Sequence, residues 1–361
     1  SSMDYSICMF NLILQSAKIK TGKLDANASS PDGEYPFFTC SKEPLKISSY
    51  SYDCECVLVA GNGDLNVKYY NGKFDAYQRT YIIEDNSNGR LYLPYLYYFM
   101  NGYVEELRKL SIGGVIKYIK LRNLTDALIE LPDIETQKYI VSILSKIKEL
   151  IGCRYQELKI LENLIKARFV EMFGNGHDGF CNTKKLGEFC KFQQGTQIPV
   201  EEQIEEQLEG YTRFLRIIDY TQAPQIPRYV SVKGREIAED SVVIVRYGAT
   251  AGFVGHGYAG ILANNLFEVV PDESILSKDF LYLALKYGTF EQEVHDKAFG
   301  AAMPALSFGM MNDIGVVTPN STAQNGFVDF VKQVDKSKAT VQKALDETQL
   351  LFDSLMQQYF G

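Results

Sequence analysis

The hydrophobic pattern of the chain changes between short apolar runs and long stretches of helical periodicity. The short runs are rich in Val, Ile, Tyr and Phe and are broken by Gly, Asn, Asp and Pro, which is typical of strands joined by turns. An amphipathic helix is predicted near residues 94–107 and another near 278–290. Strands are predicted at residues 36–40, 56–60, 66–70 and 79–83, and again at 214–218, 241–246, 251–255 and 266–270.

Two longer stretches carry apolar residues at alternating spacings of four and three, which predicts long helices over residues 132–174 and 319–361. Each begins behind a proline, Pro132 or Pro319, and stops at a glycine, Gly174 or Gly361. Two apolar seams in one chain most simply bury each other as an intramolecular coiled coil. The seam residues, which are also candidates for partner docking, are Ile140, Leu144, Ile147, Leu158, Leu161, Ile165, Phe327, Val331, Val334, Leu345, Phe352 and Leu355.

The chain also contains an internal repeat. Residues 113–174 match residues 300–361 without a gap, at the offset of 187 residues that separates Gly113 from Gly300. Further upstream the offset slips, and Asn62 then pairs with Tyr247. We therefore predict an α+β protein with an internal pseudo-twofold repeat. Its parts are a mixed α/β domain at 1–131, a long helix at 132–174, a linker at 175–185, a second mixed domain at 186–318 and a second long helix at 319–361.

The composition is that of a globular protein of 361 residues, with 46% hydrophobic and 23% charged residues. The formal net charge of −8 excludes a simple polycation. No apolar stretch approaches the roughly 20 residues that cross a membrane, and the first residues lack a secretory signal, so a cytoplasmic protein without a membrane partner is expected. Seven cysteines without repeated spacing favour reduced thiols over disulfides or a metal site.

The sequence lacks the motifs of several enzyme classes. Neither Asp-Pro-Pro-Tyr nor Asn-Pro-Pro-Phe, the tetrapeptides of adenine methyltransferases, occurs, and there is no Gly-x-x-x-x-Gly-Lys-Ser/Thr phosphate loop. His177, His256 and His295 stand among Gly or charged residues, which is typical of surface histidines and not of a catalytic triad. We therefore expect no catalytic residues, no metal ligands and no cofactor in this chain.

The two mixed domains instead offer basic, amide and aromatic residues beside glycine-rich turns. Arg pairs with guanine and Asn or Gln with adenine, whereas Lys favours phosphate. Each residue alone is more often an ordinary surface residue, but correspondence across the repeat favours a role in DNA binding. The candidates are Lys20, Lys23, Asn62, Asn66, Lys68, Gln78, Arg79, Gln194, Thr196, Gln197, Arg216, Arg246, Tyr247, Thr250, Asn264 and Asn265.

The acidic charge of the chain opposes DNA binding. Residues 13–130 hold 14 basic and 14 acidic side chains, and residues 186–318 hold 10 basic and 18 acidic ones. Neutralisation of phosphates supplies most nonspecific affinity. We therefore expect weak DNA binding by the chain alone and strong binding only with a partner that brings positive charge.

Two mixed domains, each followed by a long helix with matching ends, resemble the specificity (S) subunit of type I restriction-modification systems. Each long helix opens with a related segment, Leu-Pro-Asp-Ile-Glu-Thr-Gln at 131–137 and Thr-Pro-Asn-Ser-Thr-Ala-Gln at 318–324. Each closes on an aromatic residue and a glycine, Glu-Met-Phe-Gly at 171–174 and Gln-Tyr-Phe-Gly at 358–361. The first copy departs from the pattern at 13–22, where the Leu-Gly-Glu found at 186–188 is missing.

The resemblance implies a non-catalytic subunit. Each mixed domain is then a target recognition domain that reads one half of a bipartite site on double-stranded DNA. The two helices pair antiparallel, set the spacer between the halves and dock two modification subunits. Those subunits would carry S-adenosylmethionine, and restriction subunits, where present, would use ATP with Mg. A scaffold of the same fold that binds modification subunits without reading DNA remains the alternative, and an enzyme with an unrecognised site is a third class.

Overall fold

The computed structural model describes residues 17–174, 181–222, 225–298 and 305–361. Contacts between residues divide the chain into two compact units. The first unit comprises the residues up to Tyr155 together with Lys343–Gly361, and the second comprises Gln156–Gln342. Each unit therefore contains a mixed domain and part of each of two long helices, α4 (Ile134–Phe173) and α10 (Ser321–Phe360).

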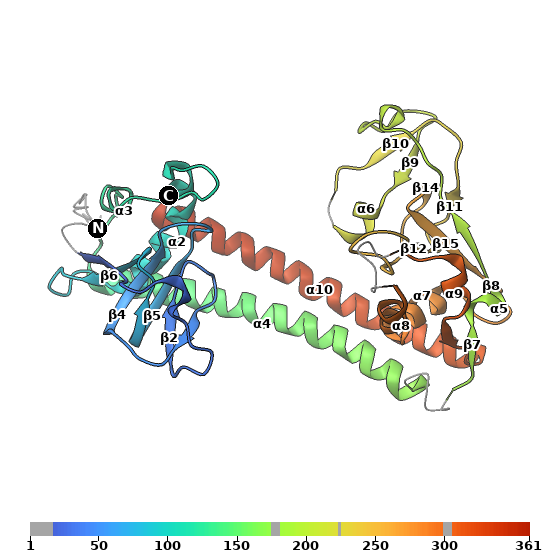
Figure 1. Ribbon diagram of the computed structural model, residues 1–361, viewed down its shortest axis with the longest axis horizontal. Helices are drawn as coiled ribbons and strands as arrows, with labels where there is room; N and C mark the ends of the chain where they lie inside the picture. Colours follow the sequence, from blue (N-terminus) through green and yellow to red (C-terminus); the bar gives the residue numbers. More distant parts are fainter. Residues whose placement is uncertain (1–16, 175–180, 223–224, 299–304) are drawn as a thin grey trace, which may run out of the picture. The chain divides into compact units, whose positions relative to one another are not determined.

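The first unit is built on a six-stranded sheet with the order β1-β6-β4-β5-β2-β3. All neighbouring strands are antiparallel except β2 and β5, which run parallel. Helix α2 (Leu93–Leu110) contacts β4 and β5 and lies against one face of the sheet (Figure 1). The strands are β1 (Ala17–Thr21), β2 (Tyr35–Phe38), β3 (Leu45–Ile47), β4 (Tyr52–Ala60), β5 (Val67–Ala76) and β6 (Thr80–Asp85).

Strand β4 shows why this sheet is stable. Successive side chains of a strand point to opposite faces, and both faces of β4 are apolar. Val57 and Val59 join the core beneath α2, while Cys56 and Leu58 join a second cluster that includes Phe74. Buried apolar side chains therefore pack on both faces of β4.

The second unit contains two four-stranded sheets with the orders β10-β9-β14-β11 and β13-β12-β15-β8, and a strand pair, β16-β7. Strands β9 and β14 run parallel, and the other pairs are antiparallel. The strands are β7 (Thr183–Lys185), β8 (Cys190–Gln194), β9 (Thr212–Leu215), β10 (Arg228–Val230), β11 (Glu236–Ile237), β12 (Val242–Val245), β13 (Val254–Gly255), β14 (Gly260–Leu262), β15 (Leu266–Pro271) and β16 (Gly315–Val317).

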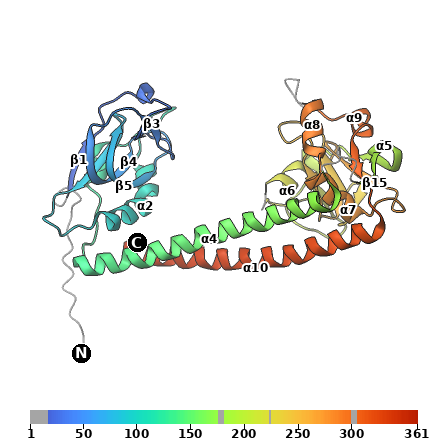
Figure 2. The ribbon, with the colours of Figure 1, turned by 90° about the horizontal axis from the view of Figure 1, so that it is seen from below.

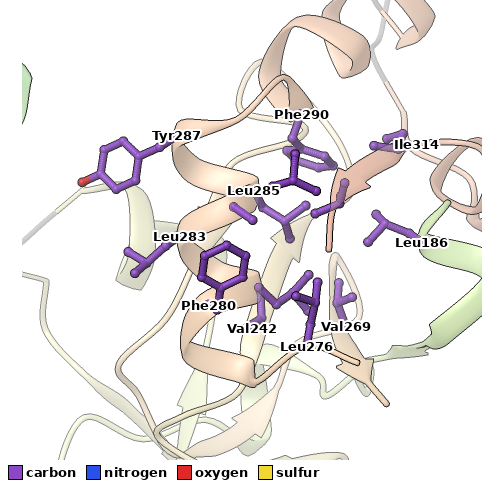
Figure 3. Close-up of a cluster of buried hydrophobic side chains, with 14 of the residues drawn as sticks. Leu186, Val242, Val269, Leu276, Phe280, Leu283, Leu285, Tyr287, Phe290 and Ile314 are labelled. Carbon is purple, nitrogen blue, oxygen red and sulfur yellow. The ribbon is translucent and has the colours of Figure 1, made fainter. Parts of the chain in front are cut away.

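Strand β12 repeats the alternation of β4. Val242 and Ile244 face the largest apolar cluster of the unit, and Val243 and Val245 face a separate one. Helix α7 (Lys278–Tyr287) covers the larger cluster, where Phe280 and Leu285 lie on the side of the helix that faces Val242 and Val269 (Figure 3). The same alternation in both units gives them a common core plan.

The long helices begin and end with clear local signals. Thr136 donates its backbone N–H (2.9 Å) and its hydroxyl (2.8 Å) to the carboxylate of Asp133, which lowers the pKa of that carboxyl group. At the other helix, Ala323 N–H donates to Oδ1 of Asn320 at 3.0 Å. Gly174 ends α4 in the left-handed region with φ of 71°, a conformation that favours glycine.

The two long helices pack together within each unit. In the second unit, α4 and α10 run side by side (Figure 2). There the rings of Phe169 and Phe173 on α4 have centroids 5.4 and 5.5 Å from that of Phe327 on α10. In the first unit, Leu144 on α4 belongs to the core against which Phe352 on α10 packs. Of the predicted seam residues, those that are buried are Ile140, Leu144, Ile147, Ile165, Phe327, Val331, Val334 and Leu345, and those that are half-buried are Leu158, Leu161, Phe352 and Leu355.

Three predicted elements differ from the structure. The strand expected at 214–218 ends at Leu215, because Arg216 caps a short helix that begins at Ile217. The strand expected at 251–255 is reduced to Val254–Gly255. The helix expected at 278–290 ends at Tyr287, and Gly288 separates it from a second helix. The short elements that sequence patterns missed include α3 (Leu121–Thr125), α5 (Leu186–Phe189), α6 (Ile217–Thr221), α8 (Phe290–Ala298), α9 (Phe308–Asn312) and the 3₁₀ turns Ala26–Ala28 and Val200–Glu202.

Other expectations concern histidines, cysteines, metals and membranes. His256 is not a simple surface histidine, because its ring stacks 4.7 Å from that of Tyr282 and its Nε2 is buried. His177 and Cys8 lie outside the described residues. The other six cysteines are free thiols. Among the described residues there is no group of three potential metal ligands and no helix long and apolar enough to span a bilayer.

Candidate nucleic-acid interface

Both units contain a tight turn that we call the tip turn, residues 77–79 in the first unit and 263–265 in the second. It joins β5 to β6 in one unit and β14 to β15 in the other. In the first, Thr80 N–H donates to Tyr77 O at 2.8 Å, and in the second, Leu266 N–H donates to Ala263 O at 3.0 Å. The tip turns carry the candidate pairs Gln78-Arg79 and Asn264-Asn265.

Neighbouring segments hold the two tip turns through the same backbone hydrogen bonds. Gly22 N–H donates to Thr80 O at 3.0 Å, and Gly195 N–H donates to Leu266 O at 3.0 Å. The second strand of each domain contributes another bond, from Tyr77 N–H to Phe38 O at 2.9 Å and from Ala263 N–H to Leu215 O at 3.0 Å. Each turn is thereby fixed from two sides.

A third side is supplied by the end of strand β4 or β12. Gly61 N–H donates to Arg79 O at 2.8 Å in the first unit, and Arg246 N–H donates to Asn265 O at 2.9 Å in the second. Beyond these residues, Asn62 and Tyr247 occupy equivalent positions and form isolated bridges with Tyr118 and Ala305. The structure thus places the two candidate sets at matching positions of a repeated framework.

Glycine is required where the first segment passes each tip turn. A Cβ atom on Gly22 would lie 2.1 Å from Ala76 O, and one on Gly195 would lie 2.1 Å from Ala263 O. These separations are far below van der Waals contact, and both neighbours are backbone atoms that cannot rotate away. Close approach of two backbone segments therefore explains both glycines.

The first unit presents charged and polar side chains at its tip turn. Gln78, Arg79 and Lys23 are exposed, and the side chains of Gln78 and Arg79 form no hydrogen bond with another described residue. Two candidates nearby are instead used internally. Lys68 Nζ donates to Ser41 O at 2.7 Å and to Asn66 Oδ1, and Asn66 Nδ2 donates to the carbonyls of residues 40 and 64, both at 2.8 Å.

Two lysines of the first unit have pKa values that reflect these surroundings. Burial lowers the pKa of Lys68. Lys20 also loses solvent, but its ion pair with Glu84 outweighs that effect and raises its pKa. Lys20 lies over the ring of Tyr52 as well, 4.8 Å from its centroid. The ammonium groups of both lysines are therefore bonded within their own domain, whereas Lys23 is exposed.

The second unit gathers neutral amides at the equivalent place. We call the side chains of Gln194, Gln197 and Asn264 the amide cluster. Gln194 Nε2 donates to Asn264 O at 2.9 Å, and Asn264 Nδ2 donates to Gln197 Oε1 at 3.3 Å. Thr196 lies between the two glutamines, and its hydroxyl oxygen accepts the backbone N–H of Arg235 at 2.8 Å. Asn265 differs, because its Oδ1 is buried and lacks a partner in the described chain.

The two predicted arginines of the second unit are held by the protein itself. Arg216 Nε donates to the fully buried Asp219 at 3.0 Å, and its Nη2 donates to Ile226 O at 2.9 Å. Arg246 Nε donates to Leu306 O at 3.3 Å, and its guanidinium lies over the rings of Tyr247 and Phe308. Thr250 is exposed in the turn before β13. The guanidinium groups of both arginines are therefore engaged in contacts within the protein.

Sequence reasoning missed a buried glutamine at the start of each long helix. Gln137 accepts the backbone N–H of Tyr92 at 2.8 Å and donates to Arg90 O and Pro132 O, both at 2.8 Å. Gln324 does the same with Ser277 N–H at 3.0 Å, Ile275 O at 2.9 Å and Pro319 O at 2.8 Å. The available signal was the recurrence of this glutamine at the repeat offset, five residues after a proline.

Comparison with known families adds an independent observation. A family model described as "Type I restriction modification DNA specificity domain" matches residues 14–163 and again residues 181–348. The two matches include both tip turns, both buried glutamines and the amide cluster.

Two curated proteins are similar in sequence. The type I restriction enzyme EcoDI specificity subunit of Escherichia coli is 37% identical over 149 residues, which cover 41% of this chain and 33% of that protein. The type I restriction enzyme MjaVIII specificity subunit of Methanocaldococcus jannaschii is 21% identical over 203 residues, 56% of this chain and 47% of that protein. The chain thus aligns with about a third to a half of the length of these relatives.

Two solved structures share the fold. The crystal structure of the type I restriction-modification system S subunit from M. genitalium has a TM-score of 0.63 at 18% identity, covering 100% of this chain and 98% of that one. A chain from work on complex assembly and conformational transition of the type I R-M system has a TM-score of 0.58 at 16% identity, covering 96% and 97%. At these identities the likeness concerns the fold.

Proposed function

Because the chain belongs to the family of type I restriction-modification DNA specificity domains, we propose that it is the sequence-specificity subunit of a type I restriction-modification complex. Each recognition domain, 1–131 and 186–318, binds one half of a bipartite site on double-stranded DNA. The observation that carries this proposal is the repeated tip turn, which holds candidate base-contacting residues at equivalent positions in the two family matches.

The chemistry of the two tip turns fits DNA. Arg, Gln and Asn side chains pair with base edges, and Lys binds phosphate. These residue types are exposed at 78–79 and 23 in the first unit. In the amide cluster of the second unit, Gln194 and Gln197 are exposed and Asn264 is half-buried. The candidate DNA contacts are accordingly Lys23, Gln78, Arg79, Gln194, Gln197 and Asn264, with Lys20, Asn62, Asn66, Lys68, Thr196, Arg216, Arg246, Tyr247, Thr250 and Asn265 lining or supporting the same surfaces.

The long helices 132–174 and 319–361 are the spacer elements of this proposal. We infer that they form an antiparallel coiled coil and that the two copies are related by a pseudo-twofold axis. Support comes from their contacts, because residues late in α4 meet residues early in α10, such as Phe173 with Phe327, whereas Leu144 and Phe352 share the core of the first unit. In this proposal, the length of the helical pair sets the distance between the two half-sites.

The same helices dock two modification subunits. The seam residues are largely buried, so docking uses apolar residues on the outer faces of the helices. Tyr139, Ile160 and Leu164 are 63, 65 and 46% exposed, values that leave large apolar side chains available to a partner. Methylation with S-adenosylmethionine, and cleavage with ATP and Mg where restriction subunits exist, belong to those partners, and the chain itself contributes recognition.

The test is a methylome measured at single-molecule resolution in cells that express a modification subunit from the same locus, with and without this chain. The proposal predicts a bipartite motif with methyladenine in both halves that disappears when the chain is removed. Co-purification of the two proteins without any chain-dependent motif would reject DNA reading and leave a scaffold that only assembles modification subunits.

A further inference from the structure

We propose that the first unit selects a guanine through Arg79 and that the second unit selects an adenine through Gln197 and Asn264 of the amide cluster. The inference rests on the proposed function and adds to it the class of base that each tip turn reads. It follows from a contrast between two equivalent frameworks. The backbone bonds are the same in both units, but the side chains they present have different hydrogen-bonding chemistry.

The first tip turn presents a free guanidinium. Arg79 O is fixed by Gly61 N–H at 2.8 Å, so the base of the side chain is held in place. The exposed guanidinium makes no hydrogen bond to another described residue, and its paired donors remain available. Two parallel donors match O6 and N7 of guanine in the major groove. Gln78 and Lys23 are exposed beside it, and Lys favours phosphate over base edges.

The second tip turn presents no exposed cation. Arg246, which is next to this turn, stacks on Tyr247 and Phe308 and donates to Leu306 O. Asn265, the counterpart of Arg79, buries its Oδ1. The amide cluster lies beside this turn, with Gln197 exposed and Asn264 half-buried. The bond from Asn264 Nδ2 to Gln197 Oε1 orients both side chains and leaves Gln197 Nε2 and Asn264 Oδ1 without partners among the described residues.

A free amide donor beside a free amide acceptor is complementary to adenine. Adenine offers N7 as an acceptor and the N6 amino group as a donor in the major groove, and Asn and Gln are the side chains that match this pair. Guanine offers two acceptors there and leaves the amide oxygen unpaired. The amide cluster therefore discriminates by chemistry, and the Asn264–Gln197 bond restrains its side chains before DNA binds.

The experiment uses the full chain assembled with modification subunits and a library of DNA duplexes randomised in both halves, with bound molecules sequenced at fixed salt. In Arg79→Ala, the preference for guanine at one position of the first half falls about 5- to 150-fold, and the second half is unchanged. The double variant Gln197→Ala/Asn264→Ala produces the converse result, a loss of similar size at an adenine of the second half.

Two further variants separate base reading from charge. Arg79→Lys keeps the charge but lacks two fixed donors, so we expect affinity to be largely retained while the guanine preference is lost. Lys23→Ala should weaken binding to all duplexes alike and reduce the salt dependence by about one phosphate contact. Since Arg79 and Lys23 are exposed, both variants keep the fold.

Each outcome bears on one of the two proposals. A guanine preference that survives in Arg79→Ala, or a first half without any guanine, overturns the base assignment and leaves the proposed function standing. So does an adenine preference that survives in the double variant. A wild-type complex that shows no sequence preference in either half overturns the proposed function itself.

Discussion

The polar side chains discussed above fall into two groups. Some are buried and bond the backbone, whereas others are exposed at the tip turns. Gln137 and Gln324 are 0 and 5% exposed, although glutamine is normally a surface residue. The side-chain amide of each glutamine bonds three backbone groups. Two of them, the N–H of the N-cap residue and the carbonyl two residues before it, lie at the start of α2 or α7, and the third is the proline carbonyl just before the long helix. The glutamines thus join each recognition domain to its helix.

Replacement of Gln324 by leucine should destabilise the second unit. The variant leaves Ser277 N–H and the carbonyls of Ile275 and Pro319 without their partner. An unsatisfied buried polar group costs about 1–3 kcal/mol, so a loss of at least this size is expected in urea unfolding followed by circular dichroism. Asn325→Ala, which changes an exposed neighbour, should stay within about 0.5 kcal/mol of wild type. Equal stability of the two variants would contradict the role of the glutamine.

Gly195→Ala should distort the second tip turn. The added methyl group would lie 2.1 Å from Ala263 O, so one backbone segment must move, at a cost of about 1–3 kcal/mol. Sequence preference in the second half should weaken with it, measured in the duplex-library assay. Gly152→Ala is the control, because its Cβ meets nothing within 4 Å and alanine favours a helix interior by about 1 kcal/mol. A Gly195→Ala protein as stable as wild type would show that the close approach is not required.

Residue-level prediction from the sequence succeeded for the correspondence between the two tip turns and failed for the orientation of individual side chains. The pairing of Gln78-Arg79 with Asn264-Asn265 matches the equivalent hydrogen bonds of the two tip turns. Nothing in the sequence distinguished Arg79, which is exposed, from Arg216, which is bound to buried Asp219. The difference arises because the short helix that begins at Ile217 brings the carboxylate of Asp219 close to Arg216. The apolar run at 214–218 had predicted a strand there instead of this helix.

At the scale of elements, the seam between α4 and α10 carries a polar contact inside the second unit. Glu162 on α4 accepts hydrogen bonds from Lys338 on α10 at 2.6 Å and from the hydroxyl of Tyr287 at 2.8 Å, and Lys286 lies 3.6 Å away. Lys338 occupies a seam position of α10 between the buried apolar residues Val334 and Val341. A polar pair at one such position specifies the register of two helices.

The contact of Glu162 with Lys338 and Tyr287 makes the stability of the second unit depend on pH. Burial alone would raise the pKa of Glu162, but the hydrogen bonds and charges of Lys338, Tyr287 and Lys286 outweigh it and lower the pKa. A lowered carboxyl pKa adds stability that is fully present above the ordinary value of 4.5 and disappears as pH falls through the folded value.

Glu162→Gln should therefore be less stable than wild type at neutral pH and converge toward it below about pH 4. We expect a difference of at most about 1 kcal/mol, since the glutamate is 40% exposed and solvent screens the pair. Urea unfolding at several pH values measures it, with Glu149→Gln, at an exposed position of the same helix, as a control. A difference that is independent of pH would show that the charge of Glu162 is not involved.

Element prediction depended on length. The forty-residue helices and the apolar strands β4, β12 and β15 were evident from periodicity. Short or polar strands such as β7 (Thr183–Lys185) have no apolar pattern of their own and exist because a partner strand pairs with them. Strand β5 pairs with both β4 and β2 in the first unit. In the second unit these two pairings are divided between two strands, because β13 pairs with β12 and β14 pairs with β9.

At the scale of the whole molecule, the repeat is the feature from which most else follows. The same glutamine, tip turn and backbone bonds occur in both units, whereas the two tip turns carry different side chains, Gln78-Arg79 and Asn264-Asn265. Framework positions must keep their hydrogen bonds, whereas exposed turn positions can vary without loss of the fold. A duplicated framework with independent tips is suited to a site of two different halves.

A matched insertion in the two long helices should lengthen the DNA spacer without altering either half. The two units divide between Tyr155 and Gln156 in α4 and between Gln342 and Lys343 in α10, so seven residues added at both points leave the internal contacts of each unit intact. Seven residues keep the heptad register and add about 10 Å of helix, which corresponds to about three base pairs at 3.4 Å each.

The duplex-library assay should then return the original half-sites with about three more unspecified base pairs between them. An insertion in α4 alone is the control, because it leaves seven residues of one helix without partners across the seam and should abolish assembly with modification subunits. Unchanged spacing in the matched variant would show that the helices do not set the distance between the halves. Altered half-sites would show that the recognition domains depend on the helices for more than their separation, since both tip turns are held entirely within their own units.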